Sequence, residues 1–129
     1  MAVTANCFIA SAQNILKIPS AAEPEFRNAV SRAYYGAYHY AKEYSEQALS
    51  IDIDNFAGPT HKKLSEALTN YTCSDKDKQR IIQRAGVRLA IFHALRIRAD
   101  YGLADMINQK DADSQIRNSL EFISALQSA

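Results

Sequence analysis

The side chains best suited to chemistry gather in one short stretch of the chain, AVSRAYYGAYHYAKEY, which also holds five of the seven tyrosines. Arg32 and His39 are seven residues apart with Tyr35 between them, so on a helix the three lie along one line. A guanidinium and an aromatic ring suit phosphates and bases, and an imidazole can transfer a proton near neutral pH. The line therefore predicts a ligand groove, a homodimer seam or simply a solvated polar face.

A second group lies in the segment RLAIFHALRIRADYGL. Arg98 and Tyr101 are about one helical turn apart there, on the side opposite Arg88 and Arg96. Arg88 and Arg96 fall near an apolar stripe, so each needs a carboxylate or access to solvent, and Asp100 can pair with an arginine. Structural ion pairs are the plainer interpretation of this segment.

Other chemistries find little support in the sequence. Paired carboxylates at metal-binding spacing, a glycine-rich phosphate loop and a GxSxG motif are all missing. The two cysteines and three histidines fit no standard zinc pattern, so we expect neither a metal nor a cofactor. A net charge of +1 argues against a histone-like coat for DNA. With no signal peptide and no membrane-spanning run in the sequence, we expect a cytoplasmic protein with reduced thiols.

The elements that must position these residues all have the periodicity of helices. A chain of 129 residues that is 47% apolar should form one domain, residues 1–129, with a substantial core. Glycine and proline fall mostly between the expected helices, which cover residues 4–17, 24–49, 60–71, 75–107 and 113–127. The short connections predict an all-α, antiparallel bundle of about five helices.

Two of these helices carry the strongest apolar stripes, so we expect them to pack as neighbours. On the second helix the core face comprises Phe26, Val30, Ala33, Tyr34, Ala37, Ala41 and Tyr44, flanked by Tyr38 and Tyr40. The fourth helix is apolar on one face through Ile81, Ala85, Leu89, Phe92, Leu95 and Ala99, and on another through Val87, Ala90, Ala94, Ile97 and Tyr101. Two apolar faces predict a nearly central helix whose small-residue face also forms a homodimer interface.

Four segments of the sequence resemble, in order, the HEPN superfamily (higher eukaryotes and prokaryotes nucleotide-binding domain). SRAYYGAYHYA looks like the signature of that family's second helix, and RIRADYGL resembles the end of its long fourth helix. GPTHKKLSEAL is similar to the start of its third helix, and SLEFISAL to its last helix. The likeness covers nearly the whole chain, and the first two segments named are the more specific.

This resemblance implies an all-α bundle that is usually homodimeric. Many members bind or cleave RNA in toxin–antitoxin, antiviral defence and stress systems, and some pair with a small nucleotidyltransferase antitoxin. The nuclease members carry an arginine, four to six residues and then a histidine near the end of the long helix. Here Arg96 is followed after four residues by Tyr101, whereas Arg32 and His39 have the family's spacing on the second helix.

Two functions therefore stay open. The first is a module that binds RNA or a nucleotide, a partner protein, or both. The alternative is a metal-independent, homodimeric endoribonuclease toxin that a nucleotidyltransferase partner neutralises. The expected catalytic residues are His39, for proton transfer, and Arg32. The expected binding residues are Arg32 and Arg98 for phosphate, Tyr35 for a base, and Tyr101.

Overall fold

The computed structural model describes residues 2–129, and every regular element in that range is a helix. The elements are α1 (Ala5–Leu16), α2 (Glu23–Gln47), the short 3-10 helix η1 (Ile53–Asn55), α3 (Thr60–Thr69), α4 (Lys76–Tyr101) and α5 (Gln109–Ser128). The prediction of an all-α bundle with five α-helices is confirmed. Among these residues, none of the helices combines the length and apolarity that crossing a bilayer demands.

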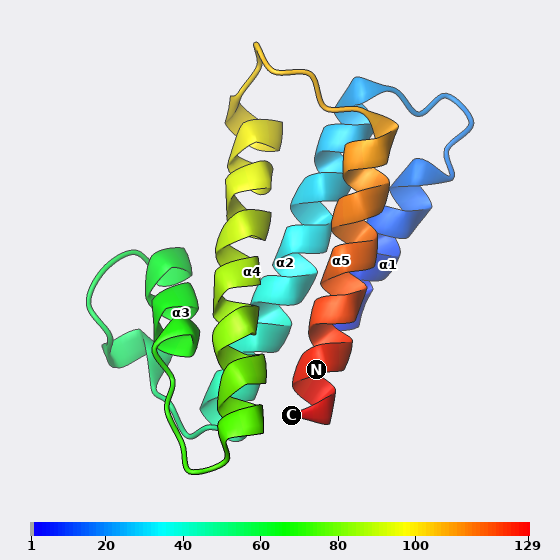
Figure 1. The fold of residues 1–129 in the computed structure, drawn as a ribbon. Coiled ribbons are helices and arrows are strands. Elements are labelled where there is room, and N and C mark those ends of the chain that lie inside the picture. The colour runs from blue at the N-terminus through cyan, green and yellow to red at the C-terminus, as the bar shows by residue number, and fades with distance from the viewer. Residues whose placement is uncertain (1) are drawn as a thin grey trace.

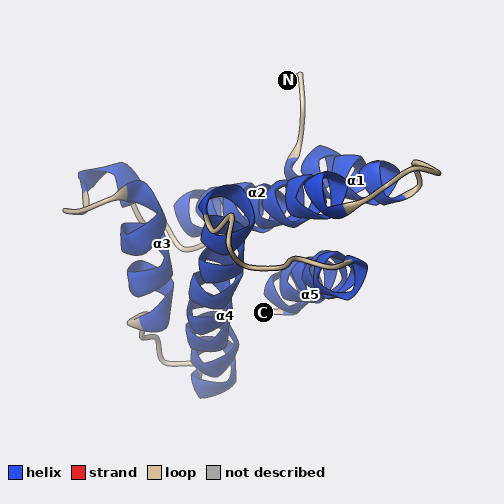
Figure 2. Ribbon diagram, turned by 90° about the horizontal axis from the view of Figure 1, so that it is seen from above, coloured by secondary structure: helices blue, strands red, loops and turns tan. Residues whose placement is uncertain are grey.

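Helices α1, α2, α4 and α5 form an antiparallel bundle, and α3 packs on the outer side of α4 (Figure 1). Seen from above, α4 lies between α3 and α5, with α2 and α1 beside them (Figure 2). As predicted, α2 and α4 are neighbours. The most enclosed helix, however, is α2 and not α4, because α2 contacts all four other α-helices while one face of α4 stays uncovered.

The predicted core stripe of α2 is confirmed. Its small residues and the Tyr34 ring are fully buried, Phe26 and Tyr44 are partly buried at its two ends, and Tyr38 is 7% exposed. Gly36 lies where α1 crosses α2, and a Cβ there would meet Cγ1 of Ile9 at 2.5 Å. The small residue inside the tyrosine-rich segment therefore permits the close approach of these two helices.

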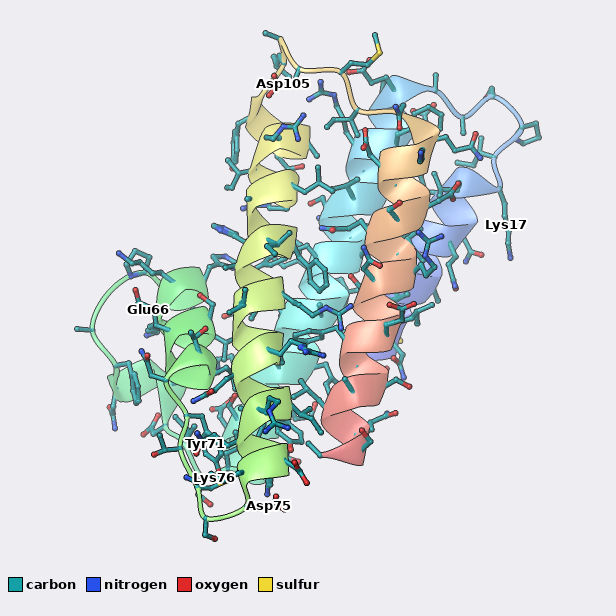
Figure 3. All side chains as sticks on the ribbon, in the orientation of Figure 1. Lys17, Glu66, Tyr71, Asp75, Lys76 and Asp105 are labelled. Carbon is teal, nitrogen blue, oxygen red and sulfur yellow. The ribbon has the colours of Figure 1, made fainter. Side chains whose placement is uncertain are left out.

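The ends of α4 differ from the prediction. Its N-cap is Asp75, whose Oδ1 accepts hydrogen bonds from the backbone N–H groups of Asp77 and Lys78 at 3.1 Å, so the helix begins at Lys76, one residue after the expected start. The helix ends at Tyr101, well short of the expected Ile107. In Figure 3, Asp75 marks the first turn of α4 and Asp105 the loop at the opposite end.

Helix α5 begins earlier than expected, at Gln109, because Asn108 caps it. The Asn108 side chain accepts a hydrogen bond from the Asp111 N–H at 2.9 Å, and the Asp111 carboxylate accepts one from the Asn108 N–H at 3.0 Å. This reciprocal pair is a capping box. The gap between the expected fourth and fifth helices, residues 108–112, thus contains the start of a helix.

Arg27 explains where α4 stops. Its guanidinium donates hydrogen bonds to the carbonyl oxygens of Arg98, Ala99 and Gly102 at the C-terminal end of the helix, and also to that of Asp105. The Glu23 carboxylate holds the same guanidinium at 2.8 Å. A side chain from α2 therefore caps the C-terminus of α4 and fixes the following loop.

We expect Arg27→Met to lower the free energy of unfolding by about 1.5–2 kcal/mol, because several carbonyls lose a charged donor while the aliphatic stem is kept. Urea denaturation measures this loss. The stability of Arg27→Lys should lie between those of the parent and Arg27→Met, since an ammonium restores the charge but not the planar fork. Equal stability of Arg27→Met and the parent would contradict the capping role.

Candidate functional site

Three helices bring aromatic and cationic side chains together on one side of the bundle. We call this group the three-helix cluster: Arg32, Tyr34, Tyr35, Tyr38 and His39 from α2, His61 from α3, and His93 and Arg96 from α4.

The antiparallel packing of α3 against α4 builds the middle of the cluster. Gly86 permits it, since a Cβ at that position would lie 2.4 Å from the Thr69 amide nitrogen. From this close crossing the two helices bring His61 and His93 into a stack, with ring centroids 4.8 Å apart and planes 15° apart. The His–His pair thus depends on a contact between backbones.

Tyr34 fixes the orientation of His61. The Tyr34 side chain is fully buried, and its hydroxyl shares a hydrogen bond 2.5 Å long with Nδ1 of His61. The Tyr38 ring lies 4.8 Å from the His61 ring, and the His93 ring lies 5.4 Å from that of Tyr34. Burial raises the pKa of Tyr34, so its hydroxyl keeps its proton at neutral pH.

The surroundings of the three histidines of the cluster lower their pKa values and so favour the neutral imidazole. Burial lowers the pKa of both His61 and His93, and the Arg96 charge lowers each further, as does His93 for His61. Burial also lowers the pKa of His39, with Lys42 adding to the effect. Neutral imidazoles can accept protons, which is the property that a general base requires.

Tyr35 lies between two cations. The guanidinium carbon of Arg32 is 5.4 Å from the centroid of the Tyr35 ring, and that of Arg96 is 5.2 Å from it. Within residues 2–129, Arg32 makes no ion pair, whereas Arg96 Nε lies 2.7 Å from Asp100 Oδ2. The half-buried Tyr35 therefore adjoins one guanidinium that is neutralised and one that is not.

Comparison with protein-family models, curated proteins and solved structures returned no match to this chain. The HEPN resemblance consequently rests on its sequence motifs. In the described chain, His, Cys, Asp and Glu side chains nowhere gather in threes where they could hold a metal ion. The chemistry of the cluster is that of imidazole, phenol and guanidinium groups.

The structure joins four of the five predicted site residues. Arg32 and His39 both lie against Tyr35, whose ring centroid is 6.2 Å from that of His39. Tyr101 is linked to them through Arg96, whose guanidinium carbon is 5.6 Å from the Tyr101 ring. His39 itself is exposed, and its ring contacts that of Phe8 of α1 in a tilted arrangement, with centroids 4.9 Å apart.

Arg98 lies apart from this group. Its Nε is 3.5 Å from the Asp105 carboxylate, in the loop that Arg27 holds. The expected pairing of Asp100 with an arginine is met by Arg96, and the Ser31 hydroxyl on α2 donates to the same carboxylate at 3.2 Å. Two arginines two positions apart therefore point to different partners, as the helical period requires.

Sequence reasoning missed His61 and His93 as members of the site. His93 precedes Arg96 by three residues and so shares its face of α4, a spacing that the sequence shows. For His61 the sequence holds no such signal, because its place depends on how α3 docks. His93 was considered only as a zinc ligand, whereas His61 also belongs to the segment GPTHKKLSEAL, which resembles the start of the family's third helix.

The lowered pKa values of His61 and His93 predict a pH dependence of stability. A histidine whose pKa is lower in the folded than in the unfolded state favours folding fully above its unfolded value, about 6.5, and loses this contribution as the pH falls below it. Urea denaturation between about pH 7 and about pH 5 should therefore show falling stability.

His93→Gln removes one of the two titrating groups, so its stability should fall less than that of the parent over the same pH range. If the free energy of unfolding changes equally with pH in the parent and in His93→Gln, protonation of the stacked imidazoles does not destabilise the fold.

Proposed function

We propose that this chain is a HEPN-like module that binds RNA or a nucleotide at the three-helix cluster. The observation that carries the proposal is the half-buried Tyr35 ring beside the guanidinium groups of Arg32 and Arg96, at 5.4 and 5.2 Å. Arg32 has no carboxylate partner within residues 2–129. A cation left unpaired beside an aromatic ring suits a ligand that combines phosphate with a base.

Each part of such a ligand has a counterpart in the cluster. Arg32 offers a planar fork that can hold a phosphate through two hydrogen bonds. Stacking of a base on Tyr35 is worth about 1–3 kcal/mol, whatever the base. Arg96 is anchored by Asp100 and holds the Tyr35 and Tyr101 rings near one another, so its role is to position these rings.

Binding of a fluorescent single-stranded RNA at low salt, measured by anisotropy, tests this proposal. Arg32→Ala should weaken binding uniformly across sequences and reduce its salt dependence, and Tyr35→Ala should weaken it roughly tenfold. Arg117→Ala removes a charge of the same kind from an exposed site on α5, so it is the matched control. Equal binding by the parent, both cluster variants and the control would refute the site.

The double variant Arg32→Ala, His39→Ala separates a functional from a structural role. Arg32 is partly exposed and His39 is exposed, so circular dichroism and melting should change little while RNA binding falls. Unfolding of this variant would instead show that the two side chains hold the bundle together.

A second candidate, metal-independent RNA cleavage, is favoured by the neutral imidazoles beside the guanidinium groups. In such a reaction a base takes the 2′-hydroxyl proton, the 2′-oxygen attacks phosphorus, and an acid protonates the 5′-oxygen as its bond to phosphorus breaks. His39 and His61 are the candidate proton carriers, and Arg32 the candidate to stabilise the phosphate charge.

Incubation of RNA with the protein in EDTA tests this candidate. Cleavage that His39→Ala or His61→Gln removes, with RNA binding retained, would establish the nuclease. Binding without cleavage would leave the binding module as the function. In both cases we propose a cytoplasmic protein of a toxin, defence or stress system, whose partner is a small nucleotidyltransferase encoded in the neighbouring reading frame.

We further propose that the protein is a homodimer formed through the uncovered apolar face of α4. The face comprises Val87, Ala90, Ile91, Ala94 and Ile97, of which Val87 is 50% and Ile91 61% exposed. An open groove between α3 and α4 continues it, with Val87, Ala90 and Ala94 among its lining residues. An apolar stripe of this length on a soluble bundle favours burial against a second copy.

Sedimentation velocity at micromolar concentration should therefore show a dimer for the parent. Val87→Asp should convert it to a monomer, since a charge in an apolar interface has no partner, and Arg117→Ala should stay dimeric. A monomeric parent would rule out this interface.

A further inference from the structure

A second hollow in the molecule lies far from the three-helix cluster, between the first three turns of α4 and the end of α5. The two helix ends that supply its lining residues, the start of α4 and the end of α5, lie at the foot of Figure 1. Its volume is about 370 Å³, which is in the range of small-molecule sites. The lining residues are Asp77, Arg80, Ile81, Arg84, Ala85, Arg88, Phe122 and Ala125. None of these belongs to the three-helix cluster, and α5 contributes nothing to that cluster.

The floor of this hollow is apolar. Ile81 and Ala85 come from α4, and Phe122 and Ala125 from α5. Phe122 is fully buried and packs edge-on against Phe92, with ring centroids 5.6 Å apart, so the floor is fixed by the core. A floor of this kind can accept a ring or a short chain without rearrangement.

The rim of the hollow is cationic. Arg80, Arg84 and Arg88 follow one another at four-residue spacing on α4, so their guanidinium groups line one edge. The Arg80 pair with Asp77 is 3.3 Å long and fully open to solvent, and Arg88 is 3.7 Å from Glu121. Such pairs are weak and readily exchanged for another anion.

Arg84 decides the character of the rim. Among residues 2–129 it makes neither an ion pair nor a side-chain hydrogen bond to the protein. The rim has three guanidinium groups and only two neighbouring carboxylates, those of Asp77 and Glu121. It therefore carries an excess of positive charge beside an apolar floor.

We infer that this hollow binds a small amphipathic anion. The ligand has a carboxylate, phosphate or sulfonate head, which the Arg84 fork holds with help from Arg80 or Arg88. It also has a ring or a short hydrocarbon chain that covers the partly exposed Ile81 and Ala125. An RNA strand matches the rim but not the floor, because the polar edges of its bases would lack hydrogen-bond partners against an apolar floor.

The dye 8-anilinonaphthalene-1-sulfonate has this anionic head and apolar body and reports binding by its fluorescence. We expect saturable binding to the folded parent, weakened roughly tenfold in Arg84→Gln, which keeps the length and polarity of an exposed side chain. Ala125→Asp should abolish binding, because it places a negative charge in the floor beside the incoming anion.

Three comparisons make the result decisive. The uncharged analogue N-phenyl-1-naphthylamine should bind weakly and respond little to Arg84→Gln, and decanoate should displace the dye where decanol does not. Binding of the dye by Arg117→Ala should equal that of the parent, because Arg117 is an exposed arginine of α5 that lies neither in the hollow nor on the face proposed for the dimer.

Other outcomes overturn the inference. Dye binding that survives both Arg84→Gln and Ala125→Asp, or that Val87→Asp removes, would place the dye on the apolar face of α4. Loss of RNA binding in Arg84→Gln with unchanged dye binding would make the arginine row a nucleic-acid contact. Because the dye assay uses no RNA, its failure is distinct from failure of the three-helix cluster to bind RNA.

Discussion

Truncation of Tyr34 to alanine should lower the free energy of unfolding by about 3–5 kcal/mol. Tyr34 is the largest fully buried side chain in the core and lies on α2, which contacts every other α-helix. Its removal leaves a cavity between α2, α3 and α4 and deprives Nδ1 of His61 of its partner. Urea denaturation measures the loss, and at a typical domain stability much of the variant would be unfolded at room temperature.

Tyr34→Phe separates the hydroxyl from the ring. It keeps the packing and removes only the hydrogen bond to His61, so it should cost about 1–2 kcal/mol. The freed imidazole can then rotate and take up a proton more easily in the folded protein, so the stability of Tyr34→Phe should depend less steeply on pH below about 6.5 than that of the parent. A cost of Tyr34→Phe as large as that of Tyr34→Ala would show that the hydrogen bond, and not the ring, dominates.

Gly86→Val should have the second largest effect, a loss of about 3 kcal/mol. A Cβ at residue 86 would lie 2.4 Å from the Thr69 amide nitrogen and 2.8 Å from the Ser65 carbonyl oxygen. Both atoms belong to the backbone of α3 and cannot move aside as a flexible side chain can. The helix must therefore shift as a whole, which separates His61 from His93.

Ala90→Val is the matched control for this change. Ala90 lies one turn further along α4 and is exposed in the single chain, so within the protomer a valine there costs only the helix propensity of a β-branched residue, about 0.5 kcal/mol. In the parent, His93→Gln should change how the free energy of unfolding depends on pH. In Gly86→Val the same substitution should change it less, because the two imidazoles no longer meet. If Gly86→Val is as stable as Ala90→Val, α3 does not depend on this close crossing.

These two variants also bear on the proposed function. Tyr34 and Gly86 contact no ligand in the proposed RNA or nucleotide site, yet both position His61. Loss of RNA cleavage with retention of RNA binding in the folded fraction of either variant would implicate the His61–His93 pair in catalysis. Arg32 and Tyr35, both on α2, should still support binding.

The sequence by itself determined the helices and their faces. An apolar period near 3.6 residues placed five helices and the core stripe of α2, because burial of one face is what keeps an amphipathic helix folded. The line of Arg32, Tyr35 and His39 was equally predictable, since the positions i, i+3 and i+7 meet on any helix. The family resemblance added the HEPN-like function, which is still a proposal.

Only the tertiary structure decided which lines of side chains meet. His61 reaches His93 because Gly86 lets two backbones touch, and no local pattern in the sequence encodes that distance. The end of α4 was misplaced for a similar reason: Arg27, more than seventy positions earlier, supplies the donors that let the helix stop at Tyr101. The helical period determines the face of a helix on which a residue lies. Which other helix packs against that face depends on contacts between residues far apart in the sequence, throughout the core.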